Sequence, residues 1–312
     1  MRNPVTIDCD YLLPRFAAAY LLVEKKSAAF VENNTAHAIP KLLKALSENG
    51  LSPKDVEYVV ITHVHLDHAG GTSALMKACP NAICLAHPRA AKHVRDPAKL
   101  IAGAKAVYGE KRFEQLYGEI EPVPANRVRE MADGEVLRWG EREWEFLHTR
   151  GHAKHHFCLW DSKVDGIFTG DAFGICYPDL QAGGLFAFAS TSPTDFEPQF
   201  ARGAAHQIAA RAPRAYPTHY GEVGNVKAVA QMLVEWIDFS ESLVGKAKSS
   251  SLSDEELPAF CQQSLDARFR SEMEKRNVFS SEAWARLAID RELNAAGLAH
   301  AAVRARHDKL PT

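Results

Sequence analysis

The sequence predicts an α/β fold built from two similar half-domains, each a sheet covered by helices, and followed by a helical extension. Two observations predict it. Strand-like segments with interspersed helices occur twice, once before residue 121 and again over residues 135–222. Beyond residue 225 the strand pattern stops and only helical periodicity continues. Interspersed strands and helices are typical of sheets covered by helices, and the change of pattern predicts a boundary between residues 1–224 and 225–312.

The first half-domain is expected to hold five strands. Apolar runs of strand length predict them over residues 5–10, 18–25, 27–33, 57–62 and 81–87. Apolar residues at helical spacing before Gly50 predict a helix over 38–50. Further helices are expected over 72–80, ending at Pro80, and over most of 88–121.

The second half-domain repeats the pattern. Strands are expected over 135–149, 155–163, 166–173 and 214–222, with a helix over 195–212. The irregular segment 172–194 is rich in glycine and aromatic residues, and it is expected to be either a wall of a substrate channel or a packed loop.

Three helices are expected after residue 225. Ser253 and Glu256 form a capping-box pattern that predicts the start of the second. The third is expected to end at Gly297. This extension either completes a pocket or forms a homodimer surface.

Composition narrows the class of protein. Of the 312 residues, 37 are basic and 39 acidic, and this balance argues against a nucleic-acid partner. No apolar run approaches the roughly 18 residues of a membrane helix. Asp8 and Asp10 stand where a signal peptide would be apolar. The six cysteines are scattered and are expected in the core. A cytoplasmic protein without a membrane partner is expected.

The stretch VVITHVHLDHAGG, residues 59–71, contains an unusual cluster of polar side chains. His63, His65, Asp67 and His68 follow an apolar strand within six residues. Because alternate residues leaving a strand point the same way, His63 and His65 can reach one point, while Asp67 and His68 can reach a second. Imidazole and carboxylate are ligands of zinc, iron and similar metals. The stretch therefore predicts part of a metal site.

Further ligand-type residues occur at three other predicted strand ends. They are His152, Asp171 and His219. Each alone indicates only a turn. The ordered set of four such places indicates a site assembled at the edge of a sheet.

This series, over about residues 5–222, resembles the metallo-β-lactamase superfamily of metal-dependent hydrolases. It is more similar to the glyoxalase II and lactonase-like branches than to true β-lactamases, because Asp171 stands where the best-known lactamases have a cysteine. The resemblance implies a four-layer αββα sandwich with two divalent metal ions at one sheet edge. The two ions are expected to be zinc, with iron or manganese as alternatives. One ion would take His63, His65 and His152, the other would take Asp67, His68 and His219, and Asp171 would bridge them.

The implied chemistry is hydrolysis of a small-molecule substrate. Two metal ions can share a hydroxide and polarise a carbonyl oxygen, so a small ester, lactone or thioester is the expected substrate. Asp67 is expected to act catalytically as well, by accepting a proton. One alternative is a mononuclear iron enzyme similar to the persulfide dioxygenases. Another is a phosphodiesterase or nuclease, which the balanced charge disfavours.

Two residues depart from the family pattern. Glu32 stands where many members have Asp-x-Gly, and it is expected either to orient a ligand histidine or to be an exposed residue at a strand end. His155 replaces a glycine of the third motif, and it is expected either to contact the substrate or a ligand, or to be a loop residue.

Overall fold

The computed structural model describes residues 3–191 and 196–307, and the chain divides into two compact units. The first comprises Met1–Thr149, His155–Gly170 and Arg211–Val226. The second comprises Arg150–Lys154, Asp171–Ala210 and Lys227–Thr312. The division at residue 224 stays a prediction. The beginning of the helix expected over 195–212 and the end of the segment 172–194 lie outside the described residues.

The first sheet of the first unit has six strands in chain order. They are β1 (Val5–Asp8), β2 (Ala18–Glu24), β3 (Ser27–Val31), β4 (Val56–Val60), β5 (Ile83–Ala86) and β6 (Val128–Glu130). The first three pair antiparallel, and β3 to β6 pair parallel. All five expected strands are present, and β6 was not predicted.

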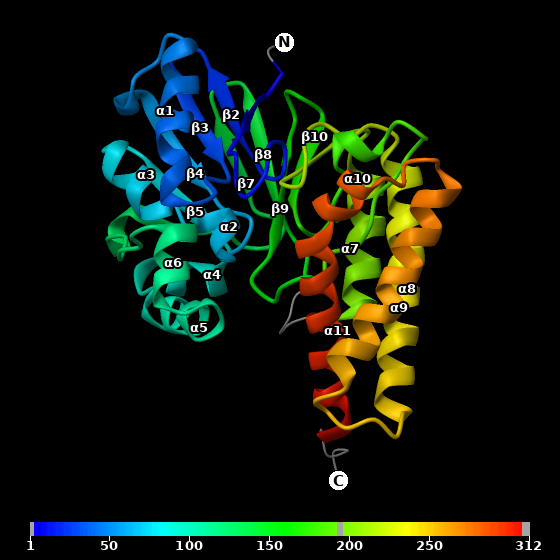
Figure 1. Ribbon diagram of the computed structural model, residues 1–312. Helices are drawn as coiled ribbons and strands as arrows, with labels where there is room; N and C mark the ends of the chain where they lie inside the picture. The colour runs from blue at the N-terminus through cyan, green and yellow to red at the C-terminus, as the bar shows by residue number, and fades with distance from the viewer. Residues whose placement is uncertain (1–2, 192–195, 308–312) are drawn as a thin grey trace. The chain divides into compact units, whose positions relative to one another are not determined.

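Six helices accompany this sheet. They are α1 (Ile39–Glu48), α2 (Leu66–Ala69), α3 (Thr72–Ala78), α4 (Pro88–Arg95), α5 (Ala98–Tyr108) and α6 (Glu110–Tyr117). Apolar residues of α1, α3 and α4 pack with one face of β1–β5 in a single buried cluster. These helices therefore cover one face of the sheet (Figure 1).

Short 3-10 turns lie at Ala36–Ala38, Pro53–Asp55, Ala125–Arg127 and Pro178–Leu180.

The second sheet, also in the first unit, has the strand order β11-β10-β9-β8-β7. Its strands are β7 (Val136–Trp139), β8 (Arg142–His148), β9 (Phe157–Asp161), β10 (Gly166–Gly170) and β11 (Ala215–Pro217). Only β10 and β11 pair parallel. All four expected strand regions are therefore present, and the first contains a hairpin of two strands.

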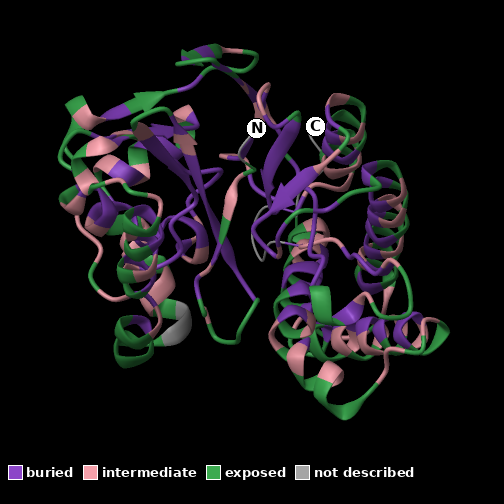
Figure 2. Ribbon diagram, turned by 90° about the horizontal axis from the view of Figure 1, so that it is seen from above, coloured by how far each residue is buried: buried purple, intermediate pink, exposed green. Residues whose placement is uncertain are grey.

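A buried aromatic layer lies between the two sheets. Tyr20 and Val60 of the first sheet pack in one buried cluster with Trp144, Phe146 and Phe168 of the second. The Tyr20 and Phe168 rings meet edge to face, with their centroids 5.2 Å apart. Figure 2 shows the strands as largely buried. This packing fixes the strand ends from which the candidate ligands extend.

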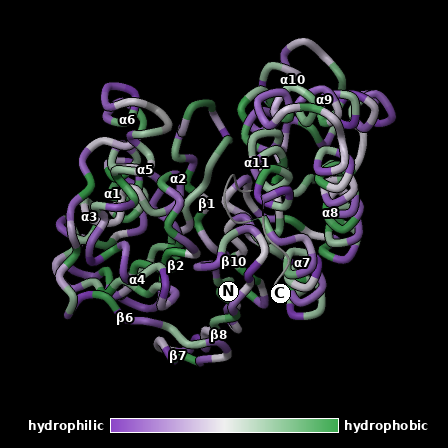
Figure 3. The backbone as a smooth tube through the Cα atoms, turned by 90° about the horizontal axis from the view of Figure 1, so that it is seen from below, coloured by the Kyte–Doolittle hydropathy of each residue, from purple (hydrophilic) through white to green (hydrophobic). Residues whose placement is uncertain are grey.

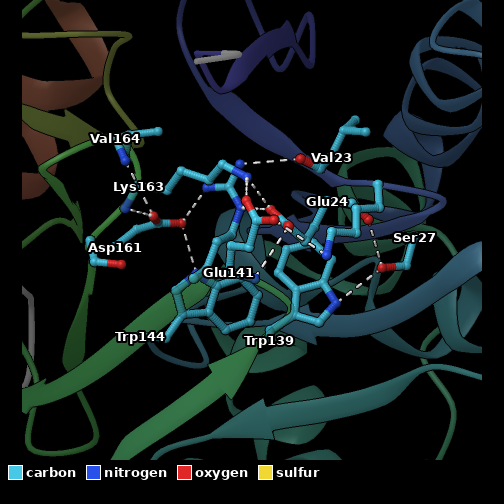
Figure 4. Close-up of polar contacts among 12 residues, drawn as sticks. Val23, Glu24, Ser27, Trp139, Glu141, Trp144, Asp161, Lys163 and Val164 are labelled. Atoms are coloured by element: carbon cyan, nitrogen blue, oxygen red, sulfur yellow. Dashed lines mark hydrogen bonds and ion pairs between the residues drawn. The ribbon is translucent and has the colours of Figure 1, made fainter.

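An ion cluster is buried at the edge of this layer (Figure 4). Arg142 is 1% exposed, and its guanidinium donates to Asp161 (2.6 Å) and to Glu24 (3.2 Å). Trp144 Nε1 donates to Asp161 (2.8 Å), and Lys163 donates to Glu24 (2.9 Å). Each buried carboxylate is thus paired with a cation, as buried charges require.

The second unit is helical. It contains α7 (Pro198–Arg211), most of α8 (Val226–Ser249), α9 (Leu257–Lys275), α10 (Ser281–Arg286) and α11 (Ala288–His307). Helices α8, α9 and α11 run side by side in Figure 1, and hydrophobic and hydrophilic stretches alternate along them in Figure 3. The rings of Trp236 and Phe269 pack 4.6 Å apart between α8 and α9. No helix in the described part of the chain is long and apolar enough to span a membrane.

Two expected helix ends are wrong. The last helix does not stop at Gly297, because this glycine is buried inside α11, which continues to His307. Close packing has overridden a local stop signal there. Helix α9 begins at Leu257 and not at Ser253, because Pro258 is tolerated only in the first turn. Ser253 still bonds Glu256 (2.7 Å), but in the turn before the helix.

Candidate metal centre

The loop after β4 carries four of the candidate ligands. His63 is fully buried, His65 caps α2, and Asp67 and His68 lie within α2. The next turn passes close to the backbone after β3, where a Cβ atom on Gly71 would lie 2.7 Å from the Thr35 carbonyl oxygen. Only glycine fits this approach. The loop is thereby held against the end of β3.

Three candidate ligands converge within the first unit. Ligand atoms of Asp67, His68 and His219 all lie within 4.8 Å of one another. The Asp67 Oδ2 atom is 3.7 Å from His68 Nε2 and 3.5 Å from His219 Nε2. His219 follows β11, so the structure brings together residues from the ends of two different sheets.

Hydrogen bonds on the far side of each ring fix which nitrogen faces Asp67. His68 Nδ1 donates to Glu32 Oε2 (2.6 Å), and His219 Nδ1 donates to the Phe16 carbonyl oxygen (2.7 Å). These partners are acceptors, so the proton of each neutral ring is on Nδ1 and the Nε2 lone pair points toward the carboxylate. Two imidazole lone pairs and one carboxylate are a donor set that fits a divalent metal ion.

Glu32 holds two parts of this arrangement together. It is 1% exposed, so the alternative of an exposed glutamate is wrong. Its Oε1 accepts from the Thr62 amide (2.7 Å), while Oε2 accepts from His68 and from Thr218 Oγ1 (3.4 Å). Its φ of 66° is in the left-handed region, which a glutamate adopts at a cost of about 1–3 kcal/mol. Such strain is typical of residues with a functional constraint.

The Glu32→Gln variant is expected to bind metal about 10- to 100-fold more weakly, because the amide lacks the charge that orients the His68 ring. Competition with a chelator of known affinity measures this. Glu135→Gln is the matched control, since that carboxylate bonds Arg129 and the Ala132 amide instead. Equal affinities of Glu32→Gln and the wild type would contradict the orienting role.

Four histidines lie close together beside this group. The His63 ring is 4.5 Å from that of His65, 6.1 Å from that of His155 and 4.9 Å from that of His156. His63 Nδ1 lies 3.0 Å from Thr62 Oγ1. His155 Nδ1 accepts a long bond from the Val64 amide (3.5 Å). His155 therefore lies beside two predicted ligands.

His93 was not predicted as part of this region. Its ring is 6.4 Å from that of His155. Burial, followed by the charge of Lys99, lowers the pKa of His93, which favours the neutral imidazole. No pattern in the sequence indicated His93, because it lies inside an ordinary amphipathic helix, α4.

The second unit holds the other two candidate ligands. His152 Nε2 lies 3.6 Å from Asp171 Oδ2. Both contact Ser190, whose carbonyl oxygen accepts from His152 Nδ1 (3.2 Å) and whose hydroxyl donates to Asp171 (3.1 Å). His152 therefore also turns Nε2 toward a carboxylate. Nothing in the sequence distinguished Ser190 from its neighbours in the segment 172–194.

A small cavity of about 20 Å³ adjoins this pair within the second unit. Its other walls are small or apolar, and they include Ala172, Ala189, Phe196, Ala204, Leu233 and Ile237. The segment after Asp171 thus contributes to the cavity through small residues. Its aromatic residues Phe173, Tyr177, Phe186 and Phe188 are buried in the packing instead.

Curated relatives match only part of the chain. A metallo-beta-lactamase fold-containing protein of Sulfurisphaera tokodaii is 26% identical over 52% of this chain and 58% of its own length. A probable hydroxyacylglutathione hydrolase of Schizosaccharomyces pombe is 27% identical over 49% of this chain and 47% of its own. An N-acyl homoserine lactonase of a Bacillus species is 25% identical over 38% of each. The matches thus span less than two thirds of these relatives.

Solved structures match nearly the whole chain. The structure of ST1585 from Sulfolobus tokodaii has a TM-score of 0.65 at 20% identity and covers 96% of this chain and 98% of its own. A family protein from Thermus thermophilus has a TM-score of 0.63 at 18% identity, with coverages of 97% and 92%. These similarities confirm the predicted fold.

The sequence model of this family provides the decisive comparison. The model described as the metallo-beta-lactamase superfamily matches residues 22–199, more than half of the chain. The match contains every candidate ligand except His219. Together with the fold and the paired His/Asp groups, it shows that the chain belongs to the metallo-beta-lactamase superfamily.

Proposed function

We propose that the protein is a metallohydrolase that cleaves a small ester, lactone or thioester with two bound divalent metal ions. Zinc is the preferred identity for these ions. The observation that carries the proposal is the convergence of Asp67, His68 and His219, with each imidazole fixed from behind by an acceptor. A purely structural histidine has no need of this geometry. The hydrolases and the lactonase among its relatives support the same class of reaction.

The proposed ligand sets are His63, His65 and His152 for one ion, and Asp67, His68 and His219 for the other, with Asp171 as the bridge. Chain connectivity supports joining residues from the two units. Asp171 directly follows Gly170 of β10, and His152 lies in a five-residue segment between Thr149 and His155 of the first unit. Both residues are therefore tethered to strand ends of the sandwich.

When bound, two such ions supply a nucleophile at neutral pH and polarise the substrate carbonyl. The side chains of the protein then orient the substrate and transfer protons. Asp67 has 28% of its side chain exposed, whereas the His68 side chain is fully buried. Asp67 is thus the member of this trio best placed to accept a proton as the leaving group departs and to pass it on to solvent, and we propose it as the catalytic carboxylate.

The small, mainly apolar cavity beside His152 and Asp171 supports a small uncharged group as the part of the substrate next to these two residues. None of the described residues that line it is Lys or Arg. An apolar wall favours an aliphatic group, and the absence of basic lining residues disfavours a phosphodiester.

The test combines metal analysis of the purified protein with a panel of lactones, thioesters, esters and phosphodiesters. Two metal ions per chain and turnover of a carbonyl substrate are expected. The Ala204→Phe variant fills this small cavity beside His152 and Asp171, so it should lower turnover of the carbonyl substrate. Ala210→Phe, exposed on the same helix, is the control. Turnover of phosphodiesters alone would contradict the proposal.

An oxidoreductase is the second candidate. One observation favours it: a rubredoxin-oxygen oxidoreductase of Megalodesulfovibrio gigas is 27% identical over 50% of the chain. As an oxidoreductase, the protein would be a mononuclear iron enzyme that resembles the persulfide dioxygenases. One iron ion per chain, together with oxygen consumption in the presence of a persulfide, would establish it in place of the hydrolase.

A further inference from the structure

Asn294, on α11, bonds the backbone on both sides of Ser190. Its Oδ1 atom accepts from the Thr191 amide (2.7 Å) and from Thr191 Oγ1 (3.0 Å). Its Nδ2 atom donates to the Ala189 carbonyl oxygen (3.3 Å). Asn294 is 5% exposed; its bonds to Thr191 are buried, and its bond to Ala189 is partly buried. A buried side-chain amide thus clamps a short piece of chain that it meets only through folding.

The residue at the centre of this clamp contacts both candidate ligands of the second unit. The Ser190 carbonyl oxygen accepts from His152 Nδ1, and the Ser190 hydroxyl donates to Asp171 Oδ2. The chain of contacts therefore runs from Asn294, through the peptides that flank Ser190, to an imidazole and a carboxylate. Partners behind metal ligands set the ring orientation and basicity of those ligands.

We propose that Asn294 is a positioning residue of the metal centre, which holds His152 and Asp171 in their ligand orientations through Ser190. This role rests on the proposed function, because it presupposes that His152 and Asp171 bind a metal ion. A side-chain amide suits the position, since it accepts from the Thr191 peptide and donates to the Ala189 carbonyl oxygen at the same time. The C-terminal helical extension then has a role in the site: it supplies the support for two ligands that lie on irregular segments.

The preceding turn of α11 offers a matched comparison. Asp290 is also buried (7% exposed), and it accepts a hydrogen bond from Tyr177 Oη (3.2 Å). Tyr177 belongs to the same segment after β10 but lies thirteen residues before Ser190. Replacement of either helix residue removes one polar anchor of the segment. Asn294, by contrast, is bonded to the peptides on both sides of Ser190.

The experiment compares Asn294→Leu with Asp290→Leu by chelator competition for zinc, and for manganese(II) and iron(II) in turn. Asn294→Leu is expected to weaken metal affinity by roughly 10- to 100-fold, and Asp290→Leu by much less. In the metal-free protein, the Thr191 amide should exchange its hydrogen faster in Asn294→Leu than in Asp290→Leu, because its acceptor has been removed. Neither readout requires a substrate.

Equal losses of affinity in the two variants, or wild-type affinity in Asn294→Leu, would overturn the positioning role and leave the proposed function intact. Wild-type protein that binds none of the three metals would overturn the proposed function, and the positioning role with it. If Asn294→Leu does not fold, Asn294→Asp and Ser190→Ala decide the question. The first removes the bond to Ala189 and the second the bond to Asp171, so both must weaken metal affinity.

Discussion

Asp67→Asn is expected to lower kcat by about 10²- to 10⁴-fold, the range for loss of a positioned proton-transfer group. Asparagine keeps the shape and one oxygen of the side chain, but it has neither the charge nor the basicity. The carboxylate lies 3.5 Å from His219 Nε2 and 3.7 Å from His68 Nε2, so metal affinity should fall as well. Metal content per chain and steady-state kinetics on the best carbonyl substrate measure the two effects separately.

The comparison of metal content with rate distinguishes the two roles of Asp67. A variant that keeps two ions but turns over slowly supports a role in proton transfer. A variant that loses an ion identifies Asp67 first as a ligand. Asp133→Asn is the control, because that carboxylate accepts a hydrogen bond from the His148 amide and is not one of the proposed ligands. Full metal content together with full turnover in Asp67→Asn would exclude the catalytic role.

The sequence predicted the sandwich well because its strands are short apolar runs that end at sharp turns. It missed β6, which has only three residues, two of them exposed. It placed the end of α11 wrongly because Gly297 is helical for a tertiary reason, its burial. Local patterns therefore identified the elements, while their ends depended on packing that no local pattern contains.

The candidate ligands could also be predicted from the sequence, since each follows an apolar strand. The residues that hydrogen-bond to these ligands were harder to predict. Glu32 was proposed because of its place after β3, and it does contact His68. The acceptor behind His219 is a backbone carbonyl, that of Phe16, which any residue type would provide. Ser190 and Asn294 meet a ligand or its neighbour only through contacts across long sequence separations, and their residue types carry no such information.

The ion cluster around Arg142 contributes to the stability of the sandwich through buried, paired charges. Burial alone raises the pKa of Glu24, but hydrogen bonds from Lys163 and from the Glu141 amide outweigh it, so the pKa lies below its usual 4.5. The stability linked to this carboxylate is present above that usual pKa. It is lost as the pH falls through the lower value in the folded protein.

Arg142→Met is expected to lower the free energy of unfolding by about 3–5 kcal/mol, because it leaves two carboxylates buried without their shared cation. Glu24 is 2% exposed and Asp161 is fully buried, so water cannot replace the guanidinium. Urea unfolding at neutral pH, with an unchanged slope against denaturant, measures the loss.

The control for this prediction removes the charges together. Adding Glu24→Gln and Asp161→Asn to Arg142→Met should restore part of the lost stability, since the amides keep acceptors for Trp144 and for the backbone but carry no charge. A single variant as stable as the wild type would show that the guanidinium is not required. A triple variant less stable than Arg142→Met would show that hydrogen bonding to the carboxylates, and not their unpaired charge, accounts for the loss.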